Sequence, residues 1–483
     1  MVDLTYRHGV TVVESPDTPS LLRIAKQGVT FVNGPAPQAD NAAFPLGMTL
    51  VTSLSQAALL GDGYLKDAVT TVFNEGGSYA IVNRVEDSED PATLEANLLG
   101  DATLGTGIYA ATKAKAKFGL TPRVLITAGD TGKYIEDGAV SVVLVSAGSS
   151  LTEAPAAEAT GGGTDPGKVL PTLQCIMGTG ADADKVASVK IVTPGKKLTS
   201  AVTVTFTGGG SDENKVLPSA TVNLGDVAGP YISALATVAE KIKARAYVEG
   251  PSTTNAEAVR WRKTINSGRI LPIDPKGVKN VAGAPVTVPV APVFAGIRSR
   301  VVASAEGVSG SVSNKLIRTL DGVARTVIYP DESNYLNENQ VATIINERGG
   351  LRTWGSRLAI DDPIWQFDSV RATADMINES LEDLFFVYVD RKFTKHNLKM
   401  MVEDGNAALR VFRLNQDILG GRVWLSDLNE PTLNANGKVF LDVEFEPVGL
   451  MEQIHVTTYR NTAYYRVLLD EVRGLVEQGP LVA

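Results

Sequence analysis

Apolar runs alternate with helical spacing over the first 130 residues of the chain. Residues 28–32 and 78–85 are short apolar runs that predict strands, whereas apolar residues at intervals of three and four in 64–74 predict a helix. An alanine-rich helix is expected over 107–118, and the apolar run 123–129 predicts a further strand. Helix followed by buried strand is typical of a parallel sheet covered by helices, so this part is predicted to be α/β.

This alternation of helix and strand stops near residue 134 and resumes near residue 229. Residues 134–228 are rich in Gly, Ser, Thr and Ala, and include the linker-like stretch 153–168. Alternating Val and Thr between glycine turns predicts a small β domain. Helices expected at 231–244 and 255–265 are each followed by another strand, so we interpret 134–228 as an insertion into a loop of the α/β domain, where longer loops cost little.

The last third of the chain has a different pattern. Residues 334–362 contain a Tyr-Leu-Asn-Glu turn, a short helix and an Arg-Thr-Trp-Gly strand. Beyond residue 366 the spacing predicts two long amphipathic helices, three strands and a closing helix. In chain order these are expected at 370–389, 395–415, 421–426, 438–447, 452–460 and 463–475.

Two β-prone segments leave their pairing partner open. In 438–447, Val439, Leu441, Val443 and Phe445 alternate with three acidic residues, so the strand has one apolar face. It is either an edge hairpin packed on its own domain, guarded by charge, or a sheet that accepts a strand from another chain. The short run Val10–Glu14 in an N-terminal arm also needs a partner sheet, from its own domain or from another subunit.

Composition excludes several classes of function. The chain has 483 residues, which predicts about three domains. A net charge of −9 argues against nucleic acid as the main partner, because phosphate binding needs a cationic face. The single cysteine, Cys175, is expected to be a small apolar filler, and folding in a reducing cytoplasm fits. No signal peptide and no membrane-spanning run is seen, so no direct membrane binding is expected.

No pattern of catalytic or metal-binding residues is found. Residues 162–169 approach a phosphate-binding loop but lack its hydroxyl residue and its strand-to-helix context, which indicates a linker. His8, His396 and His455 have no metal-ligand spacing and sit in no motif that supports a catalytic triad. Asp361-Asp362 before Pro363 indicates a break away from helix rather than a cation site. We therefore expect no enzyme, no cofactor and no metal.

Short motifs spread over the chain resemble the tail sheath proteins of long contractile-tailed phages and R-type bacteriocins. The stretch 334–363 is the most specific, and 134–228 has no counterpart. The matching residues are His8-Gly9-Val10 with Glu14, Phe44-Pro45-Leu46, Gly119-Leu120 with Pro122-Arg123, Arg245-Ala246-Tyr247-Val248, Tyr335-Leu336-Asn337-Glu338-Asn339, Arg352-Thr353-Trp354-Gly355, Asp361-Asp362-Pro363, and Gly420-Gly421 before Trp424.

The resemblance implies a multidomain α/β fold. Its main domain would be similar in topology to subtilisin without the catalytic residues, with an inserted small β domain and an α+β C-terminal domain with strand-exchanging arms. The expected division is an N-terminal arm at 1–20, an N-terminal α/β segment at 21–90, the subtilisin-like domain at 91–133 and 229–365, the inserted β domain at 134–228, and a C-terminal assembly domain with its extension at 366–483.

The resemblance also implies a role and the residues that serve it. Subunits would form six-fold rings stacked around a tail tube in a metastable extended state, and would contract to drive the tube through a cell envelope. Strands exchanged between subunits would include Val10, Thr11, Val12, Val13, Glu14, Val439, Leu441, Val443, Phe445, Ile454 and Val456. A helix facing the tube would carry Arg466, Asp470, Glu471 and Arg473.

The implied partners are further copies of this chain, the tail tube protein, and the baseplate and tail terminator proteins. The implied location is the virion tail after assembly in the host cytoplasm. An R-type bacteriocin sheath is the nearest alternative. A subtilisin-like hydrolase is a second alternative, and a surface-binding module centred on 134–228 that contacts carbohydrate is a third.

Overall fold

A six-stranded sheet forms the centre of the protein in a computed structural model that describes residues 26–477. Contacts divide the chain at Val448, and the parts before and after this residue are described separately. The strand order is β12-β11-β4-β1-β3-β2, parallel except for β2, which runs antiparallel to β3. The strands are β1 (Val29–Pro35), β2 (Gly47–Val51), β3 (Tyr79–Val85), β4 (Val124–Thr127), β11 (Arg245–Glu249) and β12 (Ile270–Ile273).

Helices cover both faces of this sheet. Neighbouring strand residues point to opposite faces and are buried on both: Val32 joins one apolar core, while Phe31 joins the other. This double burial explains the continuous apolar runs in the sequence. Helices α2 (Tyr64–Asn74) and α7 (Ala291–Val302) contribute to the first core; η1 (Gly107–Lys113), α4 (Ala114–Phe118), α5 (Pro230–Lys241) and α6 (Asn255–Lys263) contribute to the second. Short helices α1 (Leu54–Ala58) and α3 (Pro91–Leu99) lie between strands in the chain.

The predicted α/β rhythm is confirmed, with two differences. The alanine-rich segment is not one α-helix: it begins as the 3₁₀ helix η1 and becomes α-helical only at Ala114. Residues 26–90, expected as a segment apart from the main domain, contribute β1, β2 and β3 to the same sheet as β4. Strand β1 lies between β3 and β4 and pairs with both, which places these residues inside the main sheet.

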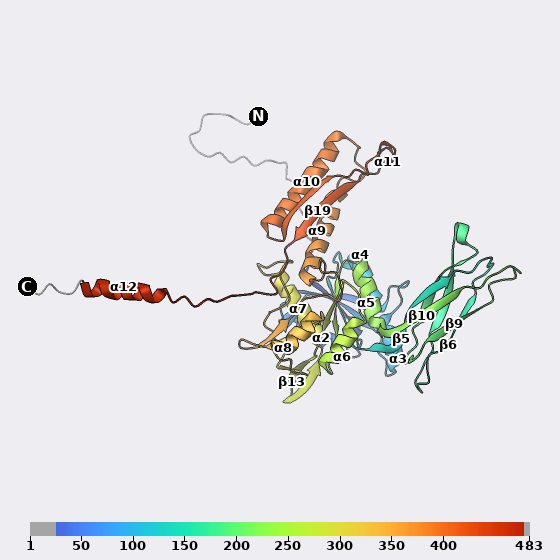
Figure 1. Cartoon of the computed structure of the whole chain (residues 1–483), viewed down its shortest axis with the longest axis horizontal. Coiled ribbons are helices and arrows are strands. Elements are labelled where there is room, and N and C mark those ends of the chain that lie inside the picture. The colour runs from blue at the N-terminus through green and yellow to red at the C-terminus, as the bar shows by residue number, and fades with distance from the viewer. Residues whose placement is uncertain (1–25, 478–483) are drawn as a thin grey trace, which may run out of the picture. The chain divides into compact units, whose positions relative to one another are not determined.

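Residues 134–228 form strands of their own, drawn in teal to green in Figure 1. Four strands pair in the order β5-β10-β9-β6, and β7 pairs with β8 around a small core that contains Cys175 and Phe206. The linker expected at 153–168 is partly wrong, because Ala156–Gly161 pairs with Val202–Thr207 as a strand. The elements are β5 (Tyr134–Ser146), β6 (Ala156–Gly161), β7 (Thr172–Met177), η2 (Gly180–Asp182), β8 (Val186–Thr193), β9 (Val202–Thr207) and β10 (Ser219–Ala228).

Small elements follow the main sheet in the chain. The Tyr-Leu-Asn-Glu segment was expected as a turn, but it is the end of a helix, and the short helix expected after it is a buried strand. The β-branched pair Ile344-Ile345 favours strand there, and both side chains are buried. These elements are β13 (Gly277–Val281), β14 (Ala284–Val288), β15 (Gly322–Val323), α8 (Asp331–Glu338), β16 (Thr343–Asn346) and β17 (Leu351–Trp354).

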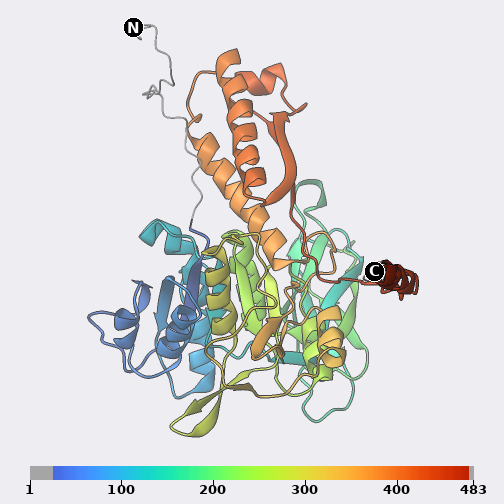
Figure 2. The same cartoon turned by 90° about the vertical axis from the view of Figure 1, so that its left-hand side faces the viewer.

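Residues 368–448 form a separate layer that we call the C-terminal lobe. Figure 2 shows its two long helices lying side by side, with a two-stranded ribbon along them. Both helices match the predicted ones within three residues at each end. The elements are α9 (Asp368–Phe386), α10 (Lys395–Leu414), β18 (Ile418–Leu425), α11 (Pro431–Ala435) and β19 (Leu441–Pro447).

Residues 449–477 form the second unit, which we call the C-terminal extension. Residues 449–461 contain neither helix nor strand, and α12 (Tyr464–Glu477) follows. The strand predicted over 452–460 is therefore not formed in the single chain. A strand needs a partner for its backbone hydrogen bonds, and no strand of the described residues pairs with this segment.

Candidate assembly interface

The ribbon of the C-terminal lobe is a two-stranded sheet, and among residues 26–477 no strand pairs with the outer edge of β19. On the outer edge of β18, the Asn406 side chain of α10 bonds the backbone N–H and C=O of Val423 at 3.0 and 2.8 Å. Strands β18 and β19 pair antiparallel, from Ile418 opposite Pro447 to Leu425 opposite Leu441. Helix α10 packs on one face of β18. An exposed edge offers unpaired backbone donors and acceptors to another strand. The lobe therefore has the geometry that accepts further strands.

The strand residues predicted here alternate as expected. Leu441, Val443 and Phe445 pack against the apolar core of the lobe, which includes Phe412 and Val423. On the opposite side, Glu444 is exposed and forms an ion pair with Arg422, with 2.6 Å between Oε1 and Nε. The predicted strand 438–447 is three residues too long at its start, so Val439 lies outside β19, which begins at Leu441. The packing expected of a hairpin on its own domain is thus present, and the open outer edge of β19 leaves strand addition from another chain available.

The C-terminal extension exposes a run of apolar side chains. Ile454 and Val456 are 75% and 78% exposed, and Tyr459 is 86% exposed. All residues from 451 to 461 are exposed. Isolated exposed apolar residues are normal on protein surfaces, but a contiguous exposed group marks an interaction site. The other predicted strand-exchange residues, Val10, Thr11, Val12, Val13 and Glu14, lie outside the described residues.

Helix α12 is amphipathic, and the predicted charged residues do not all share one side. Arg466, Asp470 and Arg473 lie along one face, with 3.5 Å between the Arg473 guanidinium and the Asp470 carboxylate. Glu471 follows Arg466 by five residues, which places it about 140° around the helix. The expectation of a single charged side is therefore corrected for Glu471. An apolar face containing Leu468 and Leu469 lies between these two sides.

Buried ion pairs join the C-terminal lobe to the main sheet, and the sequence reading missed them. Arg245 begins β11, and Arg123 and Arg269 immediately precede β4 and β12, so the three adjacent strands each start with an arginine. Their partners lie along α9: Arg245 Nε is 2.9 Å from Asp368 Oδ1, Arg123 bonds Glu379, and Arg269 bonds Asp375. Spacings of seven and eleven residues from Asp368 put these acids on one helix face, the available signal in the sequence.

The environment of these pairs is dry. Arg245 and Asp368 are each 1% exposed at the side chain, and Tyr247 Oη donates to Asp368 at 3.2 Å. Burial raises the pKa of Asp375, with Arg269 opposing the rise. Burial also lowers the pKa of Arg298, whose guanidinium lies 3.7 Å from Asp368. Each charge is thus tolerated only because its partners are in place, which ties the lobe to the sheet through α9.

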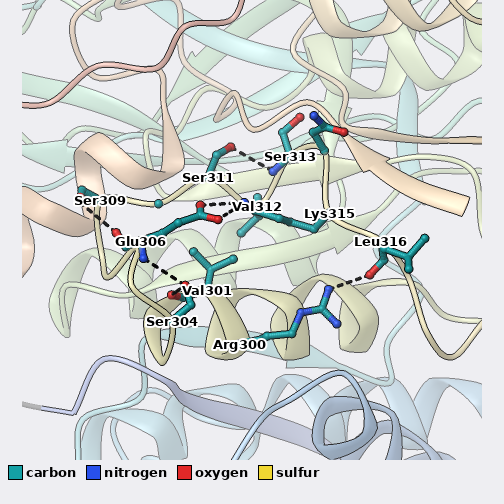
Figure 3. Close-up of polar contacts among 12 residues, drawn as sticks. Arg300, Val301, Ser304, Glu306, Ser309, Ser311, Val312, Ser313, Lys315 and Leu316 are labelled. Carbon is teal, nitrogen blue, oxygen red and sulfur yellow. Dashed lines mark hydrogen bonds and ion pairs between the residues drawn. The ribbon is translucent and has the colours of Figure 1, made fainter. Parts of the chain in front are cut away.

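A second attachment is the segment 303–321, which we call the strap. It follows α7 and contains no helix or strand, yet its backbone carbonyls at Val308 and Gly310 accept hydrogen bonds of 2.6 and 2.7 Å from buried Arg298. Figure 3 shows the strap bending back on itself, with Lys315 Nζ 2.7 Å from Glu306 Oε2. Ser309 Oγ donates to Asp417 Oδ1 of the lobe at 2.8 Å. Val308 also packs in the apolar core of the lobe.

The residues that were weighed as candidates for catalysis or ligand binding have structural roles. Lys168, in the loop that approaches a phosphate-binding motif, donates to the carbonyls of Gly161 and Gly163, and strand β7 rather than a helix follows it. Asp361 pairs with Arg262 at 3.3 Å. Cys175 is buried, and burial raises the pKa of its thiol. Among the described residues, no cluster of three metal-ligating side chains and no membrane-length apolar helix is found.

Sequence comparison relates the chain to curated tail sheath proteins. No protein-family model matches it. Over 225 residues it is 31% identical to a major tail sheath protein of a Pseudomonas aeruginosa prophage, covering 45% of this chain and 58% of that protein. Over 254 residues it is 26% identical to the tail sheath protein of Escherichia phage P2, covering 50% and 63%. The matched part therefore spans less than two thirds of either relative.

Structural comparison extends the likeness to most of the chain. The helical sheath of the anti-feeding prophage in its contracted state is 15% identical, covers 95% of this chain and 100% of its own, and has a TM-score of 0.57. The PVC sheath complex of an extracellular contractile injection system, also contracted, is 12% identical, covers 95% and 99%, and has a TM-score of 0.55. At such identities the likeness concerns the fold.

The two comparisons confirm the resemblance to tail sheath proteins of contractile tails. They also confirm a mixed α/β, multidomain fold of the kind seen in contractile sheath structures. The relatives named above are structural sheath proteins rather than enzymes.

Proposed function

We propose that this chain is the sheath subunit of a contractile phage tail or a related contractile injection particle. The observation that carries the proposal is the presence, in one sheath-like chain, of an open-edged sheet and of an extension rich in exposed apolar residues. Ile454, Val456 and Tyr459 are costly to leave in water, and the outer edge of β19 is paired with no strand of the described residues. Association of copies relieves both.

In the proposed assembly, the strand-forming segments link neighbouring subunits. Residues 452–460 and the N-terminal residues 10–14 add strands to the β18–β19 sheets of other copies, with Leu441, Val443 and Phe445 underneath. The subunits stack as six-fold rings around a tail tube, with baseplate and terminator proteins at the two ends of the virion tail. The charged face of α12, with Arg466, Asp470 and Arg473, lies toward the tube.

Contraction then needs contacts of two strengths. Backbone ladders between exchanged strands keep the subunits linked, because such ladders do not depend on one surface orientation. Exposed ion pairs such as Arg473–Asp470 are individually weak and can exchange partners. The extended array is metastable, and many small free-energy drops along the tail sum to the work of driving the tube through an envelope. Assembly takes place in the host cytoplasm and stores this energy without nucleotide hydrolysis.

Electron microscopy of negatively stained, purified chain tests the proposal. We expect hollow cylinders with six-fold end views, formed with or without added tube protein. A chain that ends at Val448 keeps all of the first unit, so it is expected to retain its circular dichroism spectrum and melting temperature but to form no cylinders. A chain that starts at residue 16 is expected to behave in the same way. Persistent monomers of the full chain in the presence of tube protein would contradict the proposal.

A further inference from the structure

The C-terminal lobe carries an apolar groove beside the end of β18. The groove has a volume of about 610 Å³ and is lined mostly by apolar side chains, among them Leu398 and Val402 from α10 and Trp424 and Leu425 from β18. Lys395 and Lys399 stand on its α10 side. Leu425 is 41% exposed, so the groove opens to solvent. An apolar groove flanked by charged residues fits an amphipathic helix.

Helix α12 has an apolar face that requires a cover. Tyr465, Leu468, Leu469, Val472 and Val476 repeat at intervals of three and four, and every one of them is exposed. Leu468 and Leu469 are 53% and 55% exposed. Burying one leucine side chain contributes about 2 kcal/mol, so leaving such a face in water is unfavourable. A charged face toward the tube would leave this apolar face uncovered.

We propose that α12 of one copy docks, apolar face inward, in the groove of the C-terminal lobe of a second copy. The inference rests on the proposed function and names the partner of the extension within it. Leu468, Leu469 and Val472 would lie on the groove floor formed by Leu398, Val402 and Trp424. Arg466, Asp470 and Arg473 would remain on the face of α12 that points away from the groove.

The charges of α12 and the length of the segment before it both fit α12 as the occupant of the groove. Glu471 flanks the apolar face of α12 on the side away from Arg466, where it can meet Lys395 or Lys399 on the α10 side of the groove. This assigns a role to the one acidic residue of α12 that departs from its charged face. Residues 449–461 are free of helix and strand and, when extended, span on the order of 40 Å, enough to reach a neighbouring subunit.

Disulfide trapping between separately labelled copies tests the docking. In a Cys175→Ser background, one chain carries Val402→Cys and another carries Leu469→Cys; the two are mixed, assembled and oxidised. We expect a disulfide-linked dimer of the mixed pair. Pairs of Val402→Cys or Leu398→Cys with Leu468→Cys or Val472→Cys cover other helix registers. Arg473→Cys, on the outer face, is the matched control and is expected to give no dimer. Dimers formed equally by the control, or no dimer in any register, would overturn the docking.

A second measurement does not depend on cysteine geometry. Val402→Asp places a charge on the groove floor, and we expect it to raise the concentration needed for half-assembly by on the order of tenfold or more. Val411→Asp places the same charge on an exposed part of α10 outside the groove lining, and is expected to leave the assembly concentration unchanged. An unchanged assembly concentration for Val402→Asp would count against the groove.

Microscopy of the same samples separates this inference from the proposed function. Six-fold cylinders without trapped dimers would leave the sheath role standing and reject the docking of α12. Trapped dimers in preparations that form no cylinders, even with tube protein, would support the docking and reject the sheath role. A disulfide that forms only within a chain carrying both substitutions would show that α12 covers its own lobe, and would reject the second copy as the partner.

Discussion

At the scale of single residues, the protein places charge where burial is deepest. Asp368 faces Arg245 and Arg298 at 2.9 and 3.7 Å, and all three side chains are 1% exposed. Removing two charges from water costs several kcal/mol per ion, which mutual attraction offsets only in good geometry. Such a cluster contributes less to stability than to the choice of one arrangement, here the attachment of α9 to β11. The cost appears when one partner is lost.

Replacing Asp368 with asparagine should therefore be strongly destabilising. Asp368→Asn leaves Arg245 and Arg298 charged and buried, and we expect the free energy of unfolding of the lobe to fall by about 3–5 kcal/mol. Urea unfolding followed by tryptophan fluorescence measures the change. Glu403→Gln removes a carboxylate of the exposed pair with Lys399 in the same lobe, and its effect should stay below about 1 kcal/mol. Equal effects of the two variants would show that the buried cluster is not a special constraint.

A pH dependence follows from Asp417, where the strap meets the lobe. Burial raises the pKa of this carboxyl, and the Ser309 hydroxyl opposes the rise. A raised folded-state pKa means that stability is fully present below the unfolded-state value and is lost as pH rises through the folded-state value. Asp417→Asn should therefore raise the melting temperature at pH 7, because the amide oxygen still accepts from Ser309 without a buried charge.

The gain from Asp417→Asn should shrink as pH falls toward the ordinary aspartate value of 3.8, where the wild-type carboxyl becomes neutral. Melting temperatures of the two proteins between pH 7 and pH 4 measure this difference. Asp427→Asn, an exposed residue of the same lobe, is the control and is expected to show no such trend. A constant difference across the range would reject titration of Asp417 as its cause.

At the scale of elements, the candidate interface depends on how closely α10 approaches β18. Gly405, inside α10, is buried, and a Cβ atom there would lie 2.9 Å from Val423 Cγ2 and 3.1 Å from the Phe385 ring. Glycine within a helix costs roughly 0.5–1 kcal/mol relative to alanine. The glycine thus allows the helix and the strand to pack closely, and the neighbouring Asn406 of α10 bonds the backbone of Val423 on β18.

A branched side chain at this position should separate the two elements. Gly405→Val is expected to lower the free energy of unfolding by about 1–3 kcal/mol, because the added atoms overlap Val423 and Phe385. Arg410→Val, on an exposed part of the same helix, carries the low helix propensity of valine without the overlap and should cost about 0.5 kcal/mol. Chemical unfolding measures both. Loss no greater than that of Arg410→Val would mean that the contact is loose.

At the scale of the whole molecule, residues 134–228 form an insertion whose excision should leave the strand pairing of the main sheet intact. The segment begins at Tyr134 and ends at Ala228, which are paired across β5 and β10, so its two ends lie side by side. Its base contacts α6 through Tyr134 and Glu257 at 2.8 Å, and through Asp226 and Arg260 at 2.7 Å. Arg260 is 40% exposed, so loss of its ion pair should cost little.

Excision should accordingly spare both folding and assembly. A chain in which 135–227 is replaced by Gly-Ser-Gly is expected to remain folded, and to form cylinders of smaller outer diameter under the conditions used for the full chain. Circular dichroism and negative-stain microscopy measure the two outcomes. Folded chains that form no cylinders would show that these strands take part in subunit contacts.

The sequence by itself determined the alternation of helix and strand around the main sheet and the two long helices of the C-terminal lobe, because burial on both faces leaves continuous apolar runs and amphipathic helices leave a period of 3.6. It also revealed the alternation of Leu441, Val443 and Phe445. Only the tertiary structure showed that Arg123, Arg245 and Arg269 converge on α9, because their partners lie more than 100 residues away in the chain. The same holds for the groove beside β18, since a groove is made by elements whose spacing no local pattern records. A strand at 452–460 was predicted from local pattern, but a strand forms only where a partner supplies the other half of its hydrogen bonds.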